Sequence, residues 1–90
     1  LSTKSKKAIE LYTEADNYRV RRQYNQAIDL LTQAINKDKN FVEAYHRLGL
    51  VYYNMRSYEK AIAQFEKGLS LTNDLRKQKM FWFDLGETYV

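Results

Sequence analysis

The sequence predicts an all-α protein made of a helical repeat, and three observations support this fold class. First, the 90 residues include three glycines and no proline, and the long stretches are rich in Lys, Glu, Gln, Leu and Ala, which favour helix. Second, apolar residues recur at spacings of three and four, as they do on one face of a helix. Third, the same residue types return after 34 positions, which indicates an internal repeat.

The first copy of the repeat, residues 8–41, is expected to form two helices joined by a turn near Arg22 and Gln23. The periodicity pauses again near residues 37–40, so the second helix is expected to end there. The spacings place the apolar residues on one face of each helix. These inward-facing residues are Leu11, Ala15, Tyr18, Ala27, Ile28, Leu31, Ala34 and Ile35.

The second copy, residues 42–75, repeats this pattern, with a turn at Arg56 and Ser57 between its two expected helices. Asn40 stands where the first of these helices needs an N-cap, and Glu43 follows three residues later, as in a capping box. Ser57 is placed to cap the second helix. The equivalent inward-facing residues are Tyr45, Leu48, Gly49, Tyr52, Ala61, Ile62, Phe65, Gly68 and Leu69.

An incomplete third copy is expected at about residues 79–90, where Trp82, Gly86 and Tyr89 repeat the second copy at an offset of 37 positions. The larger offset implies three extra residues near positions 72–75. The chain is therefore expected to be one domain of five helices, and we interpret it as a fragment of a longer protein. Trp82 aligns with core residues of the other copies, which predicts a structural role. The aromatic residues of the last helix cannot all be buried by the helices that precede them. A dimer formed by this fragment would therefore not show that the parent protein is a dimer.

Small residues stand where neighbouring helices are expected to approach most closely. Ala15 and Gly49 occupy equivalent positions on the first helix of each copy, and Ala27 and Ala61 occupy the facing positions. Large and small residues then alternate, as a packed core requires. Glycine inside a helix costs about 1 kcal/mol relative to alanine, so close packing is the expected compensation at Gly49.

A 34-residue unit of two helices, with an aromatic residue, Leu-Gly, Tyr, Ala, an aromatic residue and Ala at these intervals, resembles the tetratricopeptide repeat. The resemblance covers nearly the whole chain and implies a right-handed α–α superhelix of two full repeats plus one further helix. The chain departs from the family at Glu14, which stands at the position of Leu48, and at Lys39 and Asn73, where the repeat usually ends with proline. Glu14 indicates that the N-terminal helix is partly exposed, as at a cap or a cut end.

A second resemblance concerns cellular context. Residues 4–15 and 38–45 are similar to the N-terminal repeats of certain bacterial envelope proteins that also carry a β-propeller and an OmpA-like domain. This resemblance implies one arm of a periplasmic scaffold that joins the cell wall to a membrane-bound machine. The residues themselves leave the localisation open between the cytoplasm and the periplasm or outer membrane, and no apolar run approaches the ~20 residues that span a bilayer.

The resemblance to tetratricopeptide repeats also implies a concave groove, lined by the first helix of each repeat, that binds a peptide or protein segment. Aromatic side chains with few rotatable bonds are good anchors at such surfaces. The alternative, that these side chains only pack against neighbouring helices, stays open. The expected groove residues are Ile9, Tyr12, Asp16, Val20, Glu43, His46, Leu50, Tyr53, Asn54, Met80, Phe83, Glu87 and Val90.

Some proteins of this family bind the acidic C-terminal tails of heat-shock chaperones through a clamp of basic and asparagine side chains. The matching positions are Tyr12, Asp16, Arg47, Met80 and Asp84, and only Arg47 is basic. Two of the others are acids that would repel a carboxylate. We therefore expect that the chain does not bind chaperone tails in this way.

The composition argues against catalysis, a cofactor and a metal site. The chain has no cysteine, which excludes disulfides and thiolate ligands. Its single histidine, His46, has no serine or aspartate partner at a recognisable spacing, and no phosphate-binding loop or zinc motif occurs. We expect a non-catalytic interaction module.

Nucleic-acid binding is the alternative function. The net charge is +4, with basic clusters within residues 4–7, 19–22 and 76–79. These clusters would have to converge on one face beside stacking aromatic residues. Acidic residues interrupt both the clusters and the expected groove, which favours ordinary solvated helix faces. A steep loss of binding with salt would distinguish the nucleic-acid alternative.

Overall fold

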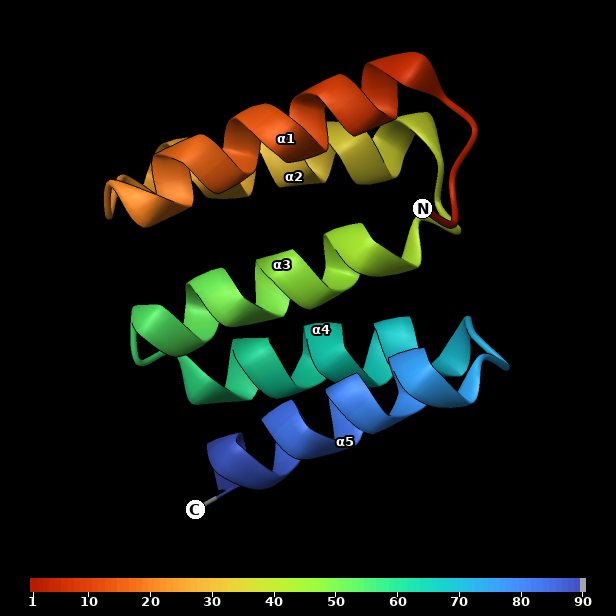
Figure 1. Ribbon diagram of the computed structural model, residues 1–90. Coiled ribbons are helices and arrows are strands. Elements are labelled where there is room, and N and C mark those ends of the chain that lie inside the picture. Colours follow the sequence, from red (N-terminus) through yellow and green to blue (C-terminus); the bar gives the residue numbers. More distant parts are fainter. Residues whose placement is uncertain (90) are drawn as a thin grey trace.

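The computed structural model describes residues 1–89, and this part of the chain forms five α-helices joined by short turns (Figure 1). The all-α fold class and the number of helices are therefore confirmed. The helices are α1 (Lys6–Val20), α2 (Tyr24–Lys37), α3 (Val42–Asn54), α4 (Tyr58–Ser70) and α5 (Leu75–Tyr89).

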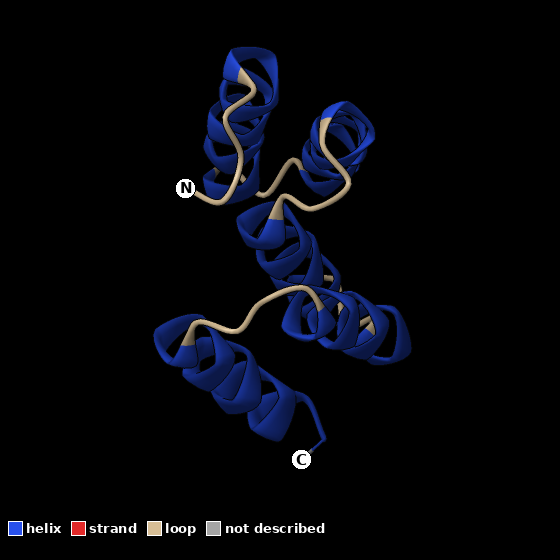
Figure 2. Cartoon of the chain, turned by 90° about the vertical axis from the view of Figure 1, so that its right-hand side faces the viewer, coloured by secondary structure: helices blue, strands red, loops and turns tan. Residues whose placement is uncertain are grey.

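Successive helices run antiparallel, and each packs against the next one along the chain (Figure 1). Seen from the side, α1 and α5 lie on one side and α2 and α4 on the other, with α3 between them (Figure 2). The result is a slab of 34 × 30 × 17 Å. This is the geometry of stacked helix pairs, in which each pair contacts only its neighbours.

Two clusters of buried side chains form the core. The first joins α1, α2 and one face of α3, with Leu31 and Phe41 among its most buried members. The second joins α3, α4 and α5 around Phe65 and Phe81, whose side chains are completely buried. The second cluster holds α5 in place and therefore determines the geometry of the face between α3 and α5.

The close approach predicted at the small positions is confirmed. Ala15, Ala27 and Ala61 are completely buried. A Cβ atom added to Gly49 would lie 2.4 Å from Cε1 of Phe65, far inside van der Waals contact. Gly49 therefore allows the Phe65 ring to lie directly against the backbone of α3.

Two arginines end helices in a conformation that the sequence did not reveal. Arg22 and Arg56 have φ angles of 62° and 63°, in the left-handed region that glycine usually occupies after a helix. In each case the next residue donates its N–H to a carbonyl five positions earlier, Gln23 to Tyr18 at 2.9 Å and Ser57 to Tyr52 at 2.8 Å. These are Schellman motifs, and they turn the chain sharply into α2 and α4.

The predicted capping of α3 and α4 is wrong in detail. The N-cap of α3 is Phe41 and not Asn40, and the N–H of Val42 donates to the Ser2 hydroxyl 2.8 Å away. Ser57 is the N-cap of α4, but its side chain makes no capping hydrogen bond. The extended N-terminal segment supplies the acceptor for α3, so a contact 40 residues apart in the sequence replaces the local cap.

The last helix begins earlier than expected. α5 starts at Leu75, so the extra residues lengthen the helix at its N-terminus and do not form a longer loop. Phe81 is completely buried, whereas Trp82, Phe83 and Tyr89 are exposed by 50%, 68% and 66%. The structural role predicted for Trp82 is therefore not realised within residues 1–89, because no helix follows α5 there to cover it.

Candidate functional site

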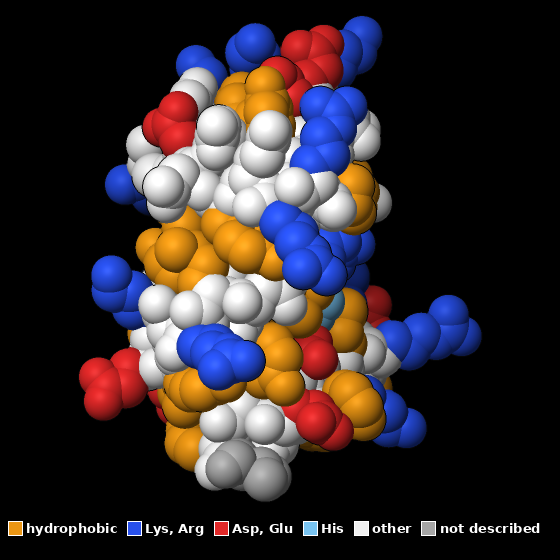
Figure 3. All heavy atoms as spheres, turned by 90° about the vertical axis from the view of Figure 1, so that its left-hand side faces the viewer, with side chains coloured by type: hydrophobic (Ala, Val, Ile, Leu, Met, Phe, Trp, Pro, Cys, Tyr) orange, Lys and Arg blue, Asp and Glu red, His pale blue; other side chains and the backbone are white. Residues whose placement is uncertain are grey.

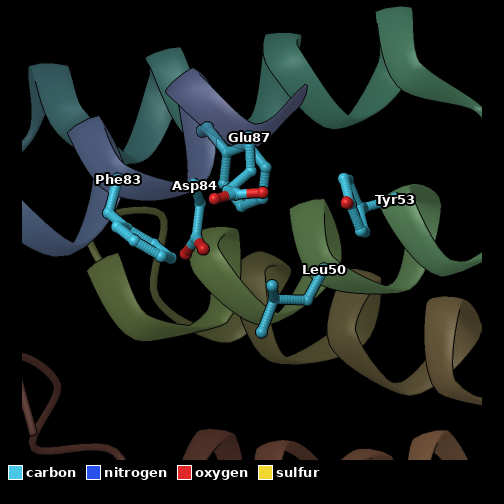
Figure 4. A pocket seen from close by; sticks show the side chains of 6 residues that line it. Leu50, Tyr53, Phe83, Asp84 and Glu87 are labelled. Carbon is cyan, nitrogen blue, oxygen red and sulfur yellow. The ribbon is translucent and has the colours of Figure 1, made fainter. Parts of the chain in front are cut away.

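A pocket opens between α3 and α5, with a floor that reaches α4 (Figure 4). Its volume is about 380 Å³, which lies within the range of about 300–1,000 Å³ typical of small ligand sites. Most of its wall is apolar, with carboxylates on one side. The lining residues are Leu50, Tyr53, Phe65, Phe83, Asp84 and Glu87.

Helix periodicity explains how these side chains converge. Leu50 and Tyr53 are three residues apart on α3, so they project from one face. Phe83 and Glu87 are four residues apart on α5 and, together with Asp84, reach across toward α3 (Figure 4). The completely buried phenylalanine of α4 closes the pocket from beneath.

A chain of polar contacts crosses the first helices of the repeats beside this pocket. Asp16 of α1 pairs with Arg19 at 3.0 Å and with Arg47 of α3 at 3.2 Å. Arg47 Nη1 lies 2.9 Å from Nδ1 of His46, and His46 Nε2 lies 2.5 Å from Oδ2 of Asp84 on α5. Contacts between charged and polar side chains therefore link α1, α3 and α5 on one side of the slab.

The two neighbours of His46 determine its tautomer. A guanidinium can only donate hydrogen bonds, so Nδ1 of His46 accepts from Arg47 and the ring proton lies on Nε2, which donates to Asp84. Burial lowers the pKa of His46, while Asp84 opposes this effect in part. The imidazole is therefore neutral near pH 7, and its side chain is only 6% exposed.

A second polar cluster lies at the N-terminal end of α3. The Glu43 carboxylate accepts hydrogen bonds from the Ser2 hydroxyl at 2.6 Å and the Ser2 N–H at 3.0 Å, and it pairs with Lys77 of α5 at 2.9 Å. Burial by itself would raise the pKa of Glu43, but the bonds from Ser2 and Lys77 outweigh it and lower the pKa to about 2. This cluster joins the N-terminal segment, α3 and α5.

The structure distributes the groove residues expected from the sequence over three kinds of position. Four of them, Leu50, Tyr53, Phe83 and Glu87, come together at the pocket. Val90 lies outside the described residues. Contact of any of these residues with a partner stays a prediction. The half-buried members are Ile9, Asp16, Glu43, Leu50, Tyr53 and Met80, the exposed members are Val20, Asn54, Phe83 and Glu87, and the buried members are Tyr12 and His46.

Tyr12 and His46 do not lie on an open surface as expected. Tyr12 is 8% exposed, its ring centroid is 5.1 Å from that of Phe41, and the Arg47 guanidinium lies over its ring, 5.4 Å from the centroid. His46 is 5% exposed and packs against Phe81, with ring centroids 5.5 Å apart. The contacts that cover both rings come from residues distant in sequence, so helical spacing did not reveal them.

The expected groove residues did not include Asp84 or Phe65, and the sequence identified Arg47 and Asp84 only as positions of the chaperone clamp and Asp84 as an acid that interrupts the groove. Phe65 was assigned to the core, where it is, and the pocket happens to reach it. A signal for Asp84 was available, because Arg47 and Asp84 lie 37 positions apart and so occupy equivalent places on neighbouring first helices. This equivalence indicates the helix face but not the partner, because Asp84 contacts His46 and not Arg47.

Figure 3 views the molecule from the end at which α1, α3 and α5 finish. Hydrophobic side chains cover much of this face, and acidic side chains and the histidine lie among them on one side.

Within residues 1–89, no group of three or more His, Asp or Glu side chains is placed to hold a metal ion. In the same part of the chain, every helix is too short or too polar to cross a membrane.

Two family models match the sequence. One, described as "TPR repeat", matches residues 15–55, and the other, described as "Tetratricopeptide repeat", matches residues 42–75. Together they cover residues 15–75, which include the second helix of the first copy and the whole of the second copy.

A curated relative and a solved structure illustrate what the chain is similar to over nearly its whole length. The chain is 33% identical over 92 residues to the cell division cycle protein 27 homolog of Caenorhabditis elegans, a match that covers 100% of this chain and 11% of that protein. The tetratricopeptide repeat domain protein of Salinibacter ruber superposes with a TM-score of 0.81 at 15% identity and covers 91% of this chain and 96% of that one. At such low identity the second likeness shows a shared fold alone.

Proposed function

We propose that this chain, which belongs to the tetratricopeptide repeat family, binds a peptide or protein segment in the pocket between α3 and α5. Repeats of this family are in general non-catalytic protein–protein interaction modules. One observation carries the proposal: apolar side chains from two repeats converge there and remain open to solvent. Phe83 is 68% exposed and Tyr53 is half-buried beside it. Aromatic residues at the centre of a concave site are frequent binding anchors.

The size of the pocket supports a side chain as the ligand and not a whole domain surface. A volume of about 380 Å³ accommodates one or two large apolar side chains at the low end of ligand-site volumes. Leu50 and Phe65 provide apolar contacts at the bottom of the pocket. Tyr53 and Phe83 flank the opening (Figure 4). We propose that the partner inserts an apolar anchor between these two rings.

We further propose that the partner is not the acidic tail of a chaperone. The one basic residue at the clamp positions, Arg47, is engaged by Asp16 at 3.2 Å and by His46 at 2.9 Å. A carboxylate ligand would have to displace these bonds. It would also approach Asp84, which repels it.

The nucleic-acid alternative has less support from the charges. Arg19 is held by Asp16 at 3.0 Å and Lys77 by Glu43 at 2.9 Å, and Lys7 lies 4.0 Å from Glu10. A member of each of the three basic clusters therefore has an acidic partner. The pocket itself carries carboxylates. Phosphate groups require uncompensated positive charge along their path.

The larger role that we propose is that of one arm of a scaffold, in which this module docks a second component. The resemblance of residues 4–15 and 38–45 to repeats of bacterial envelope proteins supports a cell-envelope assembly. Fractionation of source cells, with detection of the parent protein by antibody, tests the location. Recovery in the cytoplasmic fraction would remove the envelope proposal and leave the docking proposal unchanged.

The docking proposal is tested by affinity capture from an extract of the source, with proteins and nucleic acid both identified after washes at low and high salt. The wild-type chain should retain a discrete protein at high salt, and Phe83→Ala or Tyr53→Ala should weaken its binding by about 1–3 kcal/mol. Tyr89→Ala is the matched control, because Tyr89 is exposed by 66% on the same helix but does not line the pocket. Equal loss in Phe83→Ala and Tyr89→Ala, or retention of nucleic acid alone, would refute the proposal.

A further inference from the structure

We infer that the pocket between α3 and α5 selects a segment in which a Lys or Arg side chain lies next to the apolar anchor. This inference rests on the proposed docking function and adds the chemistry of the ligand. It depends on the charges that line the pocket, on the partners that those charges have, and on the two aromatic rings at the opening.

The charged residues in the lining are both acidic. Asp84 and Glu87 lie one helical turn apart on α5, beside Phe83 and opposite Leu50 and Tyr53 (Figure 4). The chain as a whole has a net charge of +4, so the charge at the pocket is opposite in sign to the net charge of the chain. Charge complementarity across an interface favours the correct partner and repels those of like charge, which points to a basic ligand.

One basic side chain on each of the two helices that flank the pocket is engaged elsewhere. Arg47 pairs with Asp16 at 3.2 Å, and Lys77 pairs with Glu43 at 2.9 Å. Among the ion pairs within residues 1–89, none joins Glu87 or Asp84 to a lysine or arginine. The two carboxylates therefore retain their charge toward the pocket.

The contact between His46 and Asp84 orients this negative charge without neutralising it. Because Arg47 donates to Nδ1 of His46, the imidazole presents a neutral N–H to Oδ2 of Asp84. The bond to His46 uses Oδ2 and not Oδ1 of Asp84, and the Asp84 side chain is 19% exposed. A partly desolvated carboxylate attracts a cation more strongly than a fully hydrated one.

The aromatic rings at the opening favour the same ligand. A Lys or Arg group near the face of Tyr53 or Phe83 gains a cation–π attraction. Both rings lie beside the carboxylates in the pocket (Figure 4). A segment with an apolar residue followed closely by a basic one therefore satisfies the apolar floor, the rings and the carboxylates together.

A selection from a phage-displayed library of random heptapeptides against the full 90-residue chain tests the inference. We expect enrichment of Lys or Arg next to Leu, Ile or Phe. Replacing the basic residue of an enriched peptide by Gln should weaken its binding about fivefold. Glu87→Gln should reduce the basic preference, and Glu87→Lys should reverse it toward acidic peptides.

Glu66→Lys is the matched control for charge, because Glu66 is exposed on α4 and does not line the pocket. This variant should leave the enriched motif unchanged although it alters the net charge as much as Glu87→Lys does. Enrichment of apolar peptides without a basic residue, or of acidic peptides, would overturn the inferred chemistry while the docking proposal stands. No enrichment of any sequence motif would overturn the docking proposal as well.

Discussion

Gly49 and Gly86 occupy equivalent positions on α3 and α5, and their replacement by alanine is expected to change stability in opposite directions. In both helices the substitution gains about 1 kcal/mol from the better helix propensity of alanine. The surroundings differ. A Cβ atom on Gly49 would lie 2.4, 2.6 and 2.9 Å from three atoms of the Phe65 ring, whereas a Cβ atom on Gly86 meets nothing within 4 Å.

The Phe65 ring has little room to move away from an alanine at position 49. It is completely buried, and its centroid lies 5.9 Å from that of His46 and 6.4 Å from that of Phe81. Overpacking of a core typically costs about 1–3 kcal/mol, and three contacts under 3.0 Å place this site at the upper end. After the propensity gain, Gly49→Ala should destabilise the chain by about 2 kcal/mol, whereas Gly86→Ala should stabilise it by about 1 kcal/mol.

Urea and thermal unfolding followed by far-ultraviolet circular dichroism measure both effects. The two variants should differ by about 3 kcal/mol in the free energy of unfolding. For a domain of this size each kcal/mol shifts Tm by about 4–8 °C, so their Tm values should differ by more than about 10 °C. Gly68→Ala is an internal check, because its Cβ atom would lie 2.4 Å from Cζ of Phe81, and it should resemble Gly49→Ala. Equal stabilisation by Gly49→Ala and Gly86→Ala would refute the close approach of α3 and α4.

Three further predictions concern the turns, the polar cluster and the core. Arg56→Gly should raise stability by about 1 kcal/mol, because Arg56 has a φ of 63° that only glycine adopts without cost; an unchanged Tm would contradict this. Glu43 has a pKa lowered from 4.5 to about 2, so its stabilisation is present above pH 4.5 and is lost as the pH falls toward 2. Glu43→Gln should therefore reduce the change in the free energy of unfolding between pH 4.5 and 2. The upper limit of this reduction is about 3 kcal/mol, and solvent screening lowers it because Lys77 is partly exposed; an unaltered profile would exclude this role. Ala61→Leu should destabilise by about 1–3 kcal/mol through overpacking, since Ala61 is completely buried; a fully stable variant would argue against the helix register.

The fold was predictable because its signals are local. Residues such as Leu31 and Phe65 recur with helical spacing and with the period of the repeat, and both are buried as that pattern requires. The turns were located from the same pattern. Their conformation was not, because nothing in the identity of Arg22 or Arg56 indicates a left-handed φ angle, for which glycine is the usual choice.

The candidate site was only partly predictable. Leu50, Tyr53, Phe83 and Glu87 were expected to line one groove, and they meet at one pocket, although their contact with a partner stays a prediction. His46 was placed on the same face, yet the contact with Asp84, 38 residues later, buries its ring between helices. Spacing within a helix identifies the side on which a residue lies, but the position of α5 relative to α3 decides which side chains on that side remain open.

The sequence by itself determined that this chain is a repeat of five helices with a core of residues such as Leu31 and Phe65, because these properties depend on residues within a few turns of one another and on the period of the repeat. Only the tertiary structure decided which polar groups meet. Ser2 and Glu43 are 41 residues apart, Asp16 and Arg47 are 31 apart, and His46 and Asp84 are 38 apart. The strength of each pair depends on a distance between helices and on exclusion of water, and the order of residues along the chain specifies neither.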